Sequence, residues 1–448
     1  MSEHVIYRDL KRVYPKVVKG KGIYLYDQNG KEYIDGSSGP MVVNIGHGVE
    51  EIIEAMIEQA KKVCFVSRLQ FTSDAQIELA EKIVSFAPKG LSAVSFVSGG
   101  SEANEVALKM ARQYHIETGN FSKFKIISRW QSYHGSTIGS LSMTGHPKWR
   151  KNFIPYILNF PHIYPPYCYR CSFGKEYPNC DIDCAKELER VIKQEGSETI
   201  SAFISEPIVG DSGGAIVPPP EYFEIIRSIC SKYDVLMISD EVITGLGRTG
   251  KNFGIDHWNV VPDIITMGKG ISSGYTPLSA VIVHQKLYDV FMNSARENRS
   301  SMEGFGYGAT FSGNPLSCNV GLAVLEYIEK NNLVKKAEDM GVYLLRKLEV
   351  LKEIETVGDI RGKGLLVGIE FVREKNKKTP FERKKYFSKK IGDTAFEMGL
   401  ICYPGYGGID GILGDHVIIA PPLIVSELEI ERIVSILEKS IIKAQNAI

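Results

Sequence analysis

The chain has 448 residues, of which 44% are hydrophobic and 24% charged, so it is long enough for two domains and has the composition of a globular protein. Lysine plus arginine and aspartate plus glutamate each number 53, and this zero net charge gives no reason to expect nucleic acid or an anionic membrane as a partner. The polar N-terminus does not resemble a signal peptide, and no apolar run in the sequence has the length of a membrane span. The sequence therefore predicts a cytoplasmic protein.

The N-terminal region predicts a β-hairpin followed by two helices. Residues 22–35 form two alternating apolar runs joined by an Asn-Gly pair, which is a strong hairpin signal. Apolar residues then recur at helical spacing over residues 49–63 and 74–86. Proline and glycine after residue 86 end the second of these helices.

From residue 93 to residue 283 the chain alternates between strands and helices. Apolar runs predict strands at 93–97, 125–128, 200–205, 235–239, 264–267 and 278–283. Helical spacing predicts helices at 104–115, 185–194 and 222–233. This alternation predicts an α/β fold in which a mostly parallel sheet lies between two layers of helices.

Four of the eight cysteines lie close together in this region, at Cys168, Cys171, Cys180 and Cys184. A disulfide framework is not expected in a long chain without a secretion signal. The spacing leaves a structural zinc ion open, although the gap between the two pairs is shorter than in the usual zinc ribbons and fingers. Reduced, packed thiols are the favoured interpretation, and no metal is expected at a catalytic site.

The C-terminal part predicts a smaller unit of its own. A long helical pattern after Pro315 runs to about residue 330, and strands follow near 356–360, 365–371 and 417–420 before a final helix from Ser426. The charged segment 373–390 is interpreted as a solvated face without a function.

A lysine between two glycines follows the predicted strand 264–267. Lys269 would lie at the carboxyl end of that strand, where open α/β sheets bind their ligands. A lysine held away from solvent can lose its proton and form a Schiff base with a carbonyl group. Taken alone, the segment is more simply an ordinary loop, so its interpretation depends on the other motifs.

A glycine-rich segment, residues 98–104, follows the predicted strand 93–97. Its backbone around Gly100 can wrap an anion, and Ser101 is placed to begin a helix whose free N–H groups face that anion. The segment lacks the lysine of a nucleotide P-loop, so a single phosphate ester fits better than a triphosphate. A plain helix cap is the alternative interpretation.

Two acidic residues, Asp240 and Glu241, stand at the end of the predicted strand 235–239. Burial of a carboxylate is costly unless a cation meets it, and a protonated ring nitrogen, a metal or an arginine would serve. The following residues 245–250 match the G-x-G-x-x-G pattern by letter. Because no amphipathic helix opens from them, a dinucleotide site is rejected.

Two further residues complete the predicted site. Tyr133 follows the strand 125–128 and can stack on a flat heterocycle, while His134 is interpreted as a supporting residue. Thr310 lies in a loop of small residues and can donate a hydrogen bond to phosphate, although a capped turn explains its loop equally well. A phosphate cradle, an aromatic platform, a strand-end acid and a strand-end lysine together describe a site for pyridoxal 5′-phosphate.

With these motifs in order, the sequence resembles the class III aminotransferases, the ω-amino acid branch of the fold-type I pyridoxal-phosphate enzymes. The resemblance extends from about residue 14 to the last predicted helix. The matching stretches are 44–48, 98–105, 133–135, 206–207, 239–242, 245–250 with Phe253, 268–270, 310–315 and 420–423.

The resemblance implies a large domain with a mostly parallel sheet between helices and a smaller α+β domain. It implies a division into an N-terminal segment 1–65 that packs with the small domain, a large cofactor-binding domain 66–315 and a small C-terminal domain 316–448. It further implies a homodimer with shared active sites, in which Thr310 reaches the phosphate bound by the neighbouring subunit.

The resemblance also assigns roles around the cofactor. Lys269 would bind the aldehyde of pyridoxal phosphate, and Asp240 would pair with its pyridine nitrogen. The remaining residues implied to hold the cofactor are Gly100 and Ser101 at the phosphate, Tyr133 and Val242 on the two faces of the ring, and Glu206 as a hydrogen-bonding partner.

Two departures from the family pattern bear on the amine donor. Ile418 stands where members acting on α-amino acids often have an arginine, and isoleucine cannot clamp a carboxylate. Pro40 and Met41 stand where many members have a bulky aromatic residue, which predicts a more open pocket. The expected donor is a β- or ω-amino acid, a β-aminoacyl thioester such as 3-aminobutyryl-CoA, taurine or a plain amine.

The expected acceptor is a 2-oxo acid such as pyruvate or 2-oxoglutarate. The candidates for binding the carboxylate of this acceptor are Arg68, Arg129 and Arg361. The alternative activity on the same scaffold is that of a pyridoxal-phosphate-dependent epimerase or aminomutase, which would return the amine within one molecule.

Overall fold

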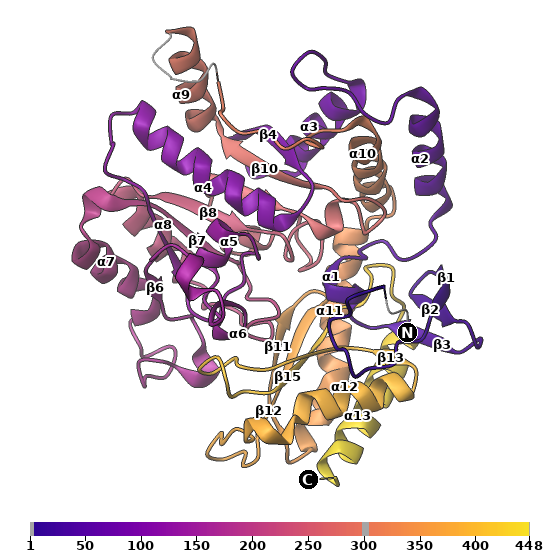
Figure 1. Cartoon of the computed structure of the whole chain (residues 1–448). Coiled ribbons are helices and arrows are strands. Elements are labelled where there is room, and N and C mark those ends of the chain that lie inside the picture. The colour runs from indigo at the N-terminus through magenta and orange to yellow at the C-terminus, as the bar shows by residue number, and fades with distance from the viewer. Residues whose placement is uncertain (1–3, 298–303, 448) are drawn as a thin grey trace.

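A seven-stranded sheet forms the centre of the larger part of the molecule, in the upper half of Figure 1. The structure, a computed structural model, describes residues 4–297 and 304–447. The strand order is β4-β10-β9-β8-β7-β5-β6. The strands are β4 (Leu91–Val97), β5 (Lys125–Arg129), β6 (His162–Ile163), β7 (Ile200–Ser205), β8 (Leu236–Asp240), β9 (Ile264–Met267) and β10 (Ser279–His284).

Six of these strands run in one direction. Strands β9, β8, β7, β5 and β6 pair in parallel, and β10 is antiparallel to both of its neighbours, β9 and β4. Strand β4 therefore points the same way as the parallel strands. As a result, the segments that follow β4, β5, β7, β8 and β9 all emerge at one edge of the sheet, which is where ligands bind in such folds.

Helices cover both faces of the sheet, as Figure 1 shows. Helices α4 (Gly100–Glu117) and α9 (Gln285–Arg296) pack on one face, and α7 (Asp183–Glu195) and α8 (Tyr222–Lys232) pack on the other. Strand β8 illustrates the alternation, because Leu236 and Ile238 contact the α4 side while Met237 belongs to the opposite core. The predicted α/β fold with a mostly parallel sheet is confirmed.

The other helices of this part lie beside the sheet. They are α1 (Ser38–Met41), α2 (Glu50–Lys62), α3 (Asp74–Phe86), α5 (Ile138–Met143), α6 (Pro147–Arg150) and α10 (Pro315–Lys330). Helix α10 packs against both α2 and α3. None of the helices within the described residues combines the length and the apolar character that crossing a membrane requires.

The lower part of the molecule contains an antiparallel sheet in the order β11-β12-β15-β14 (Figure 1). A third sheet joins the two ends of the chain, because β13 pairs in parallel with β3 of the N-terminal hairpin. The elements are β1 (Val17–Lys21), β2 (Tyr24–Asp27), β3 (Glu32–Asp35), α11 (Leu333–Leu348), β11 (Val357–Lys363), β12 (Leu366–Phe371), α12 (Phe387–Glu397), β13 (Leu400–Ile401), β14 (Tyr403–Gly405), β15 (His416–Ile419) and α13 (Glu427–Gln445). This pairing brings the N-terminal hairpin to the small C-terminal part, although α2 packs against α10, which packs against α3 of the larger part. The division at residues 65 and 315 stays a proposal.

The structure differs from the sequence-based prediction at several helices. Helix α4 begins at Gly100 rather than at residue 104, and α9, α11 and α12 were not predicted. The segment 373–390 is not only a solvated face, because Phe381 is 3% exposed and Phe387 is fully buried. The charged residues between these two aromatic residues, among them Lys384 and Lys385, hide the apolar positions of the segment in the sequence.

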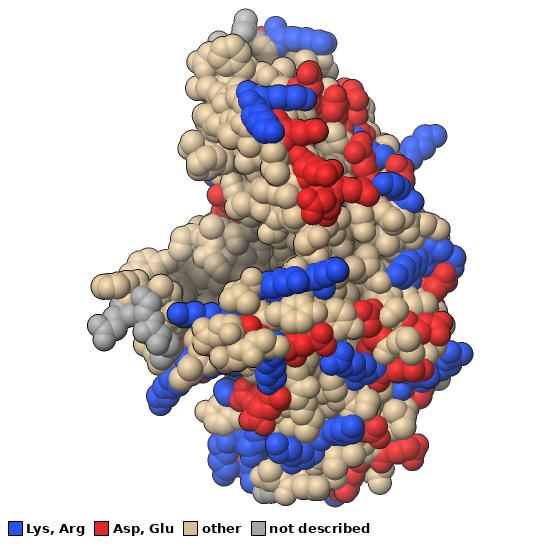
Figure 2. All heavy atoms as spheres, turned by 90° about the vertical axis from the view of Figure 1, so that its right-hand side faces the viewer, with Lys and Arg blue, Asp and Glu red and all other residues tan. Residues whose placement is uncertain are grey.

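Acidic and basic side chains occur together over the face drawn in Figure 2, and an uncharged hollow opens at its edge. Neither sign of charge dominates this face, in keeping with the equal numbers of basic and acidic residues in the chain.

The four clustered cysteines lie around one small cavity of about 20 Å³. Their thiols are free, and burial raises the pKa of Cys184 to about 12. Within the described ranges, no three cysteine, histidine or acidic side chains are arranged to hold a metal ion. The segment that contains these cysteines also contacts the small sheet, because Arg170 Nε donates to Glu370 Oε1 at 2.5 Å. The interpretation of these cysteines as packed thiols stays a prediction.

Candidate active site

A cavity of about 190 Å³ opens at the edge of the sheet where the parallel strands end. Seven of the eight residues predicted from the sequence line this cavity, and Thr310 does not. The lining residues are Gly100, Ser101, Asn104, Tyr133, His134, Gly135, Glu206, Asp240, Val242, Ile243 and Lys269. A larger cavity of about 960 Å³ lies between α4, α9 and residues 305–307 and includes none of these side chains.

Lys269 follows β9 and has an unusual backbone conformation. Its φ angle is +46°, in the left-handed region that costs a non-glycine residue roughly 1–2 kcal/mol. Such conformations are concentrated at functional sites, where the surrounding structure enforces them. Burial lowers the pKa of Lys269 to about 8, although the negative charges of Asp211, Asp240 and Glu206 oppose this shift. The amine is therefore much closer to its nucleophilic, neutral form at physiological pH than a free lysine would be.

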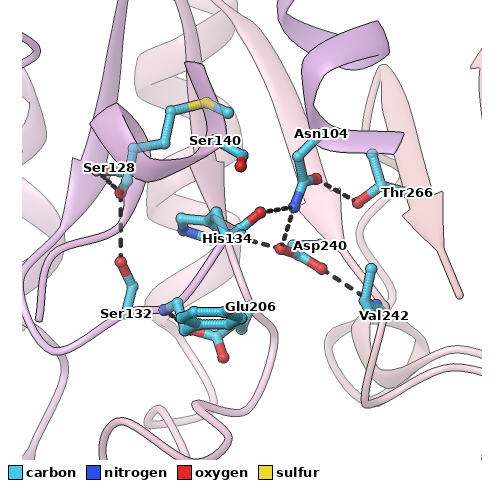
Figure 3. Close-up of polar contacts among 12 residues, drawn as sticks. Asn104, Ser128, Ser132, His134, Ser140, Glu206, Asp240, Val242 and Thr266 are labelled. Atoms are coloured by element: carbon cyan, nitrogen blue, oxygen red, sulfur yellow. Dashed lines mark hydrogen bonds and ion pairs between the residues drawn. The ribbon is translucent and has the colours of Figure 1, made fainter. Parts of the chain in front are cut away.

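Asp240, the last residue of β8, is held by three neighbours, as Figure 3 shows. Its Oδ2 atom accepts a hydrogen bond from Asn104 Nδ2 at 2.8 Å and lies 2.7 Å from His134 Nδ1. Its Oδ1 atom accepts from the backbone N–H of Val242 at 3.1 Å. Asn104 is itself oriented by Thr266, whose hydroxyl donates to Asn104 Oδ1 at 2.8 Å. Since Asp240 is 3% exposed, this network fixes the carboxylate in one orientation.

The contacts of His134 identify its tautomer. Its Nε2 atom is buried and has no hydrogen-bond partner among the residues described. An imidazolium would bury an N–H without an acceptor there, which costs more than burying a bare acceptor nitrogen of a neutral ring. Neutral His134 therefore donates its Nδ1–H to Asp240, and Asp240 carries the negative charge of the pair.

The start of α4 provides a place for an anion. The first N–H groups of a helix have no acceptor within the helix, and the helix dipole adds a partial positive charge. Position 100 has no room for a larger residue than glycine, because a Cβ atom there would lie 2.8 Å from Val242 Cγ1. Gly135 closes the other side with a φ angle of +134°, and a Cβ atom there would lie 2.5 Å from Ser101 Oγ.

Glu206 and Tyr133 lie together on the next side of the cavity. Glu206 Oε1 accepts from the N–H of Gly210 at 3.0 Å, and its Oε2 accepts from the N–H of Tyr133 at 3.4 Å. Burial raises the pKa of Glu206. The Tyr133 ring is half-buried and lies 4.7 Å from the ring of Trp149, while its hydroxyl lies 2.9 Å from Ser136 Oγ.

Three residues near the site were not singled out from the sequence. Asn104 of α4 donates to Asp240, and Thr266 of β9 donates to Asn104. The only signal for Asn104 was its place one helical turn after Gly100. Asp211 lies close enough to Lys269 for each to shift the pKa of the other. No local pattern marks Asp211, since its position follows from the loop after β7.

The predicted arginines and Thr310 lie outside the cavity lining. Arg361 forms ion pairs with Asp359 at 2.8 Å and with Glu370 at 3.0 Å, so its guanidinium group binds carboxylates of the small sheet. Arg129 is fully buried, with Nη2 donating to the carbonyl of Glu206. Arg68 donates to the carbonyl of Tyr307 at 2.6 Å. Thr310 is exposed.

The two positions that depart from the family pattern meet in one apolar cluster. Met41 and Ile418 are buried together with Ile208, and Ile243 packs against this cluster while it also lines the cavity. The cavity wall at Ile243 is therefore hydrocarbon, and Met41 and Ile418 lie behind it rather than in the lining. An α-carboxylate would meet no charged partner on this wall.

The fold and the cavity define the class of protein. A buried lysine with a lowered pKa, a fixed carboxylate and the free start of a helix fit the aldehyde, the ring nitrogen and the phosphate of pyridoxal phosphate, respectively. The model of the family described as Aminotransferase class-III matches residues 6–441.

Known proteins agree with this match. The chain is 41% identical to the uncharacterized aminotransferase YodT of Bacillus subtilis, over 98% of each chain. It is similar to the structure of a transaminase from the marine bacterium Virgibacillus, with a TM-score of 0.91 and 36% identity over 99% of this chain and 98% of the other. It is also similar to the omega transaminase from Pseudomonas jessenii in complex with PMP, with a TM-score of 0.90 and 35% identity over 97% and 93% of the two chains. The protein belongs to the class III aminotransferases and is a fold-type I, pyridoxal-phosphate-dependent enzyme.

Proposed function

We propose that the protein transfers an amino group from a β- or ω-amine donor to a 2-oxo acid. The observation that carries this proposal is the apolar wall at Ile243, which lines the cavity of Lys269 and packs against the buried side chains of Met41 and Ile418. This wall disfavours a donor with a carboxylate next to its amine. The donors considered are β-amino acids, β-aminoacyl thioesters such as 3-aminobutyryl-CoA, taurine and plain amines, and the acceptors are pyruvate or 2-oxoglutarate.

We assign the residues roles that follow from their contacts. The bound cofactor supplies an electron-accepting ring conjugated to the amine nitrogen. Asp240 holds a proton at the ring nitrogen, and Asn104 and His134 keep its carboxylate in place. Lys269 binds the aldehyde and then, as a free amine, moves the proton at the amine-bearing carbon of the donor.

Other residues bind and orient the cofactor in this proposal. Gly100 and Ser101 hold the phosphate at the start of α4, Tyr133 and Val242 cover the two faces of the ring, and Glu206 hydrogen-bonds beside it. All five line the same cavity as Lys269.

We also propose a homodimer with shared sites, in which Thr310 binds the phosphate held by the partner subunit. The exposure of Thr310 and its place outside the cavity of its own chain support this role. The free thiols fit a reducing compartment, so the cytoplasm is the proposed location.

The proposed function is tested by separating the two half-reactions. Purified holoenzyme mixed with a β- or ω-amine and no acceptor is expected to lose the absorbance of the lysine-bound cofactor and to release one aldehyde or ketone per site. Pyruvate or 2-oxoglutarate added afterwards should restore that absorbance. A racemised or shifted amine without any carbonyl product would show an epimerase or aminomutase instead, and would contradict the proposal.

A matched pair of glycine variants tests the phosphate cradle. In Gly100→Ala the new Cβ atom would push Val242 toward the ring, since only 2.8 Å separates it from Val242 Cγ1. If this displacement costs the cofactor about as much free energy as one charged hydrogen bond, the dissociation constant for pyridoxal phosphate is expected to rise about tenfold. Gly99→Ala is the control, because a Cβ atom at position 99 meets nothing within 4 Å. Equal affinities in a fluorescence titration of the two variants would contradict this arrangement.

A further inference from the structure

Beside the cavity, two cations rest on aromatic rings and form no ion pair within the described residues. Lys148 Nζ lies 4.9 Å from the centre of the Trp149 ring and 4.6 Å from that of Tyr406. The guanidinium carbon of Arg383 lies 3.4 Å from the centre of the same Tyr406 ring. In addition, Arg383 Nη1 is buried without a hydrogen-bond partner among the residues described.

These side chains come from both parts of the molecule. Lys148 and Trp149 belong to α6 beside the large sheet, Tyr406 follows β14 of the small sheet, and Arg383 belongs to the charged segment between β12 and α12. His146 joins the two parts, because its Nε2 atom lies 3.0 Å from the carbonyl oxygen of Tyr406. The cluster is thus built by the tertiary structure and is not a run of surface lysines.

The cluster adjoins the active site. The Trp149 ring lies 4.7 Å from the ring of Tyr133, which lines the cavity. Asp211 provides a second connection: burial raises the pKa of its carboxyl group, and the nearby charges of both Lys148 and Lys269 oppose this shift. Its Oδ2 atom also accepts a hydrogen bond from Tyr403 at 3.3 Å. A ligand that extends from Lys269 past Tyr133 would therefore reach Trp149 and Lys148.

The charges of the cluster favour an anion. Three cations, Lys148, Arg383 and Arg8, lie around Tyr406 and Tyr403: Lys148 and Arg383 lie on the Tyr406 ring, and Arg8 is close enough to Tyr403 for its charge to oppose the raised pKa of that hydroxyl. Two carboxylates oppose them, Asp211 and Asp410, of which Asp410 already accepts from the N–H groups of Ile412 and Leu413. A cation that is partly shielded from water and lacks a carboxylate partner binds a phosphate or carboxylate group well.

We infer that the amine donor carries a negatively charged group, a phosphate or a carboxylate, at the end remote from its amine, and that Lys148 and Arg383 bind this group. The inference rests on the proposed function and narrows its donor class. The aromatic rings of Trp149 and Tyr406 would contact the chain that links the two ends of the donor. Because the cations lie beyond the ring of Tyr133, the charged group must be several bonds from the reacting carbon.

The test compares three donors that share a terminal amine and a similar length: 5-aminopentyl phosphate, 6-aminohexanoate and 6-aminohexanamide. The rate of absorbance loss in the first half-reaction is measured against donor concentration. We expect the two anionic donors to half-saturate the enzyme at concentrations about tenfold lower than the neutral amide, as one charged hydrogen bond predicts. The order of phosphate and carboxylate identifies which anion the cluster prefers.

Two variants locate the effect. Lys148→Met and Arg383→Met should each raise the half-saturating concentration of the anionic donors about tenfold, with little change in their maximal rate. The half-saturating concentration of the amide should not change. Lys384→Met is the matched control, because Lys384 neighbours Arg383 but is exposed and paired with Glu382 at 2.6 Å. The absorbance of the bound cofactor and the thermal midpoint verify that each variant is folded.

Each outcome bears on a distinct statement. Reaction with the amide but no advantage for the anionic donors overturns this inference and leaves the proposed function intact. If the two variants raise only the half-saturating concentration of 2-oxoglutarate in the second half-reaction, the cluster binds the acceptor instead, and this inference is also overturned. Failure of all amines to react, in holoenzyme that retains lysine-bound cofactor, contradicts the proposed function itself.

Discussion

Replacing Lys269 by alanine is expected to abolish covalent binding of pyridoxal phosphate and to lower kcat by about 10⁴-fold or more, since both the Schiff base and the proton-transferring amine are lost. The native fold should persist, because the side chain faces the cavity and alanine relieves the burial of an amine whose pKa is lowered to about 8. Borohydride reduction followed by peptide mass spectrometry measures the attachment directly, without any dependence on turnover.

Lys251→Ala is a suitable control for this variant. Lys251 is exposed and pairs with Glu338 at 3.4 Å, so its loss should leave cofactor attachment and kcat unchanged. A reduced adduct found on another lysine of the Lys269→Ala protein, together with substantial turnover, would show that the nucleophile had been assigned to the wrong residue.

The exchange Asp240→Asn should leave the cofactor bound but slow turnover severely. Asparagine has the shape of aspartate but cannot hold a positive charge at the ring nitrogen. Removing one partner of a buried charge pair costs about 3–5 kcal/mol, and if this cost falls on the transition state, kcat falls by about 10²- to 10⁴-fold. Single-turnover absorbance measurements with a reactive amine donor compare the two proteins at equal cofactor content.

The neighbouring residue Glu241 offers the control for this exchange. It is also buried, but it accepts hydrogen bonds from the N–H groups of Gly254 at 2.7 Å and Ile255 at 2.8 Å and is not part of the cavity lining. Glu241→Gln should therefore reduce stability by about 1–3 kcal/mol and leave kcat of the folded holoenzyme close to normal. If Asp240→Asn and Glu241→Gln had equal effects on kcat, Asp240 would have no special role at the ring.

Local sequence patterns were sufficient to find the strand ends that form the site. Lys269 and Asp240 could be recognised because each follows a short apolar run, and the alternation of such runs with helices indicated that the runs were parallel strands of one sheet. Apolar spacing placed the start of α4 four residues late, at residue 104, because small polar residues at a helix start carry no apolar periodicity, whereas the glycine-rich segment placed it at Ser101, next to the observed start at Gly100. Helix α12 was missed for a similar reason, since lysines surround its buried residues Phe387 and Ile391.

The supporting contacts could not be predicted in the same way. Asn104 and Asp240 are 136 residues apart, and Thr266 is 162 residues from Asn104, so no local pattern relates them. The fate of the candidate arginines also depended on distant partners, because Arg361 is occupied by Asp359 and Glu370. A sequence does not show which arginine side chains are already paired, because only the neighbours of a guanidinium group in space decide whether it is free to bind a substrate.

The sequence by itself indicated the cofactor and the two residues on which catalysis is proposed to depend, since these follow from chemical groups at the ends of recognisable strands, and its resemblance to a known family indicated the class of enzyme. The tertiary structure alone decided what surrounds them: the orientation of Asp240, the apolar wall at Ile243, and the meeting of Lys148 with Tyr406 and Arg383 beside the cavity. The reason is physical. Strand and helix patterns arise from interactions between residues near in sequence, whereas burial, pKa and substrate contacts are set by residues that only the folded chain brings together.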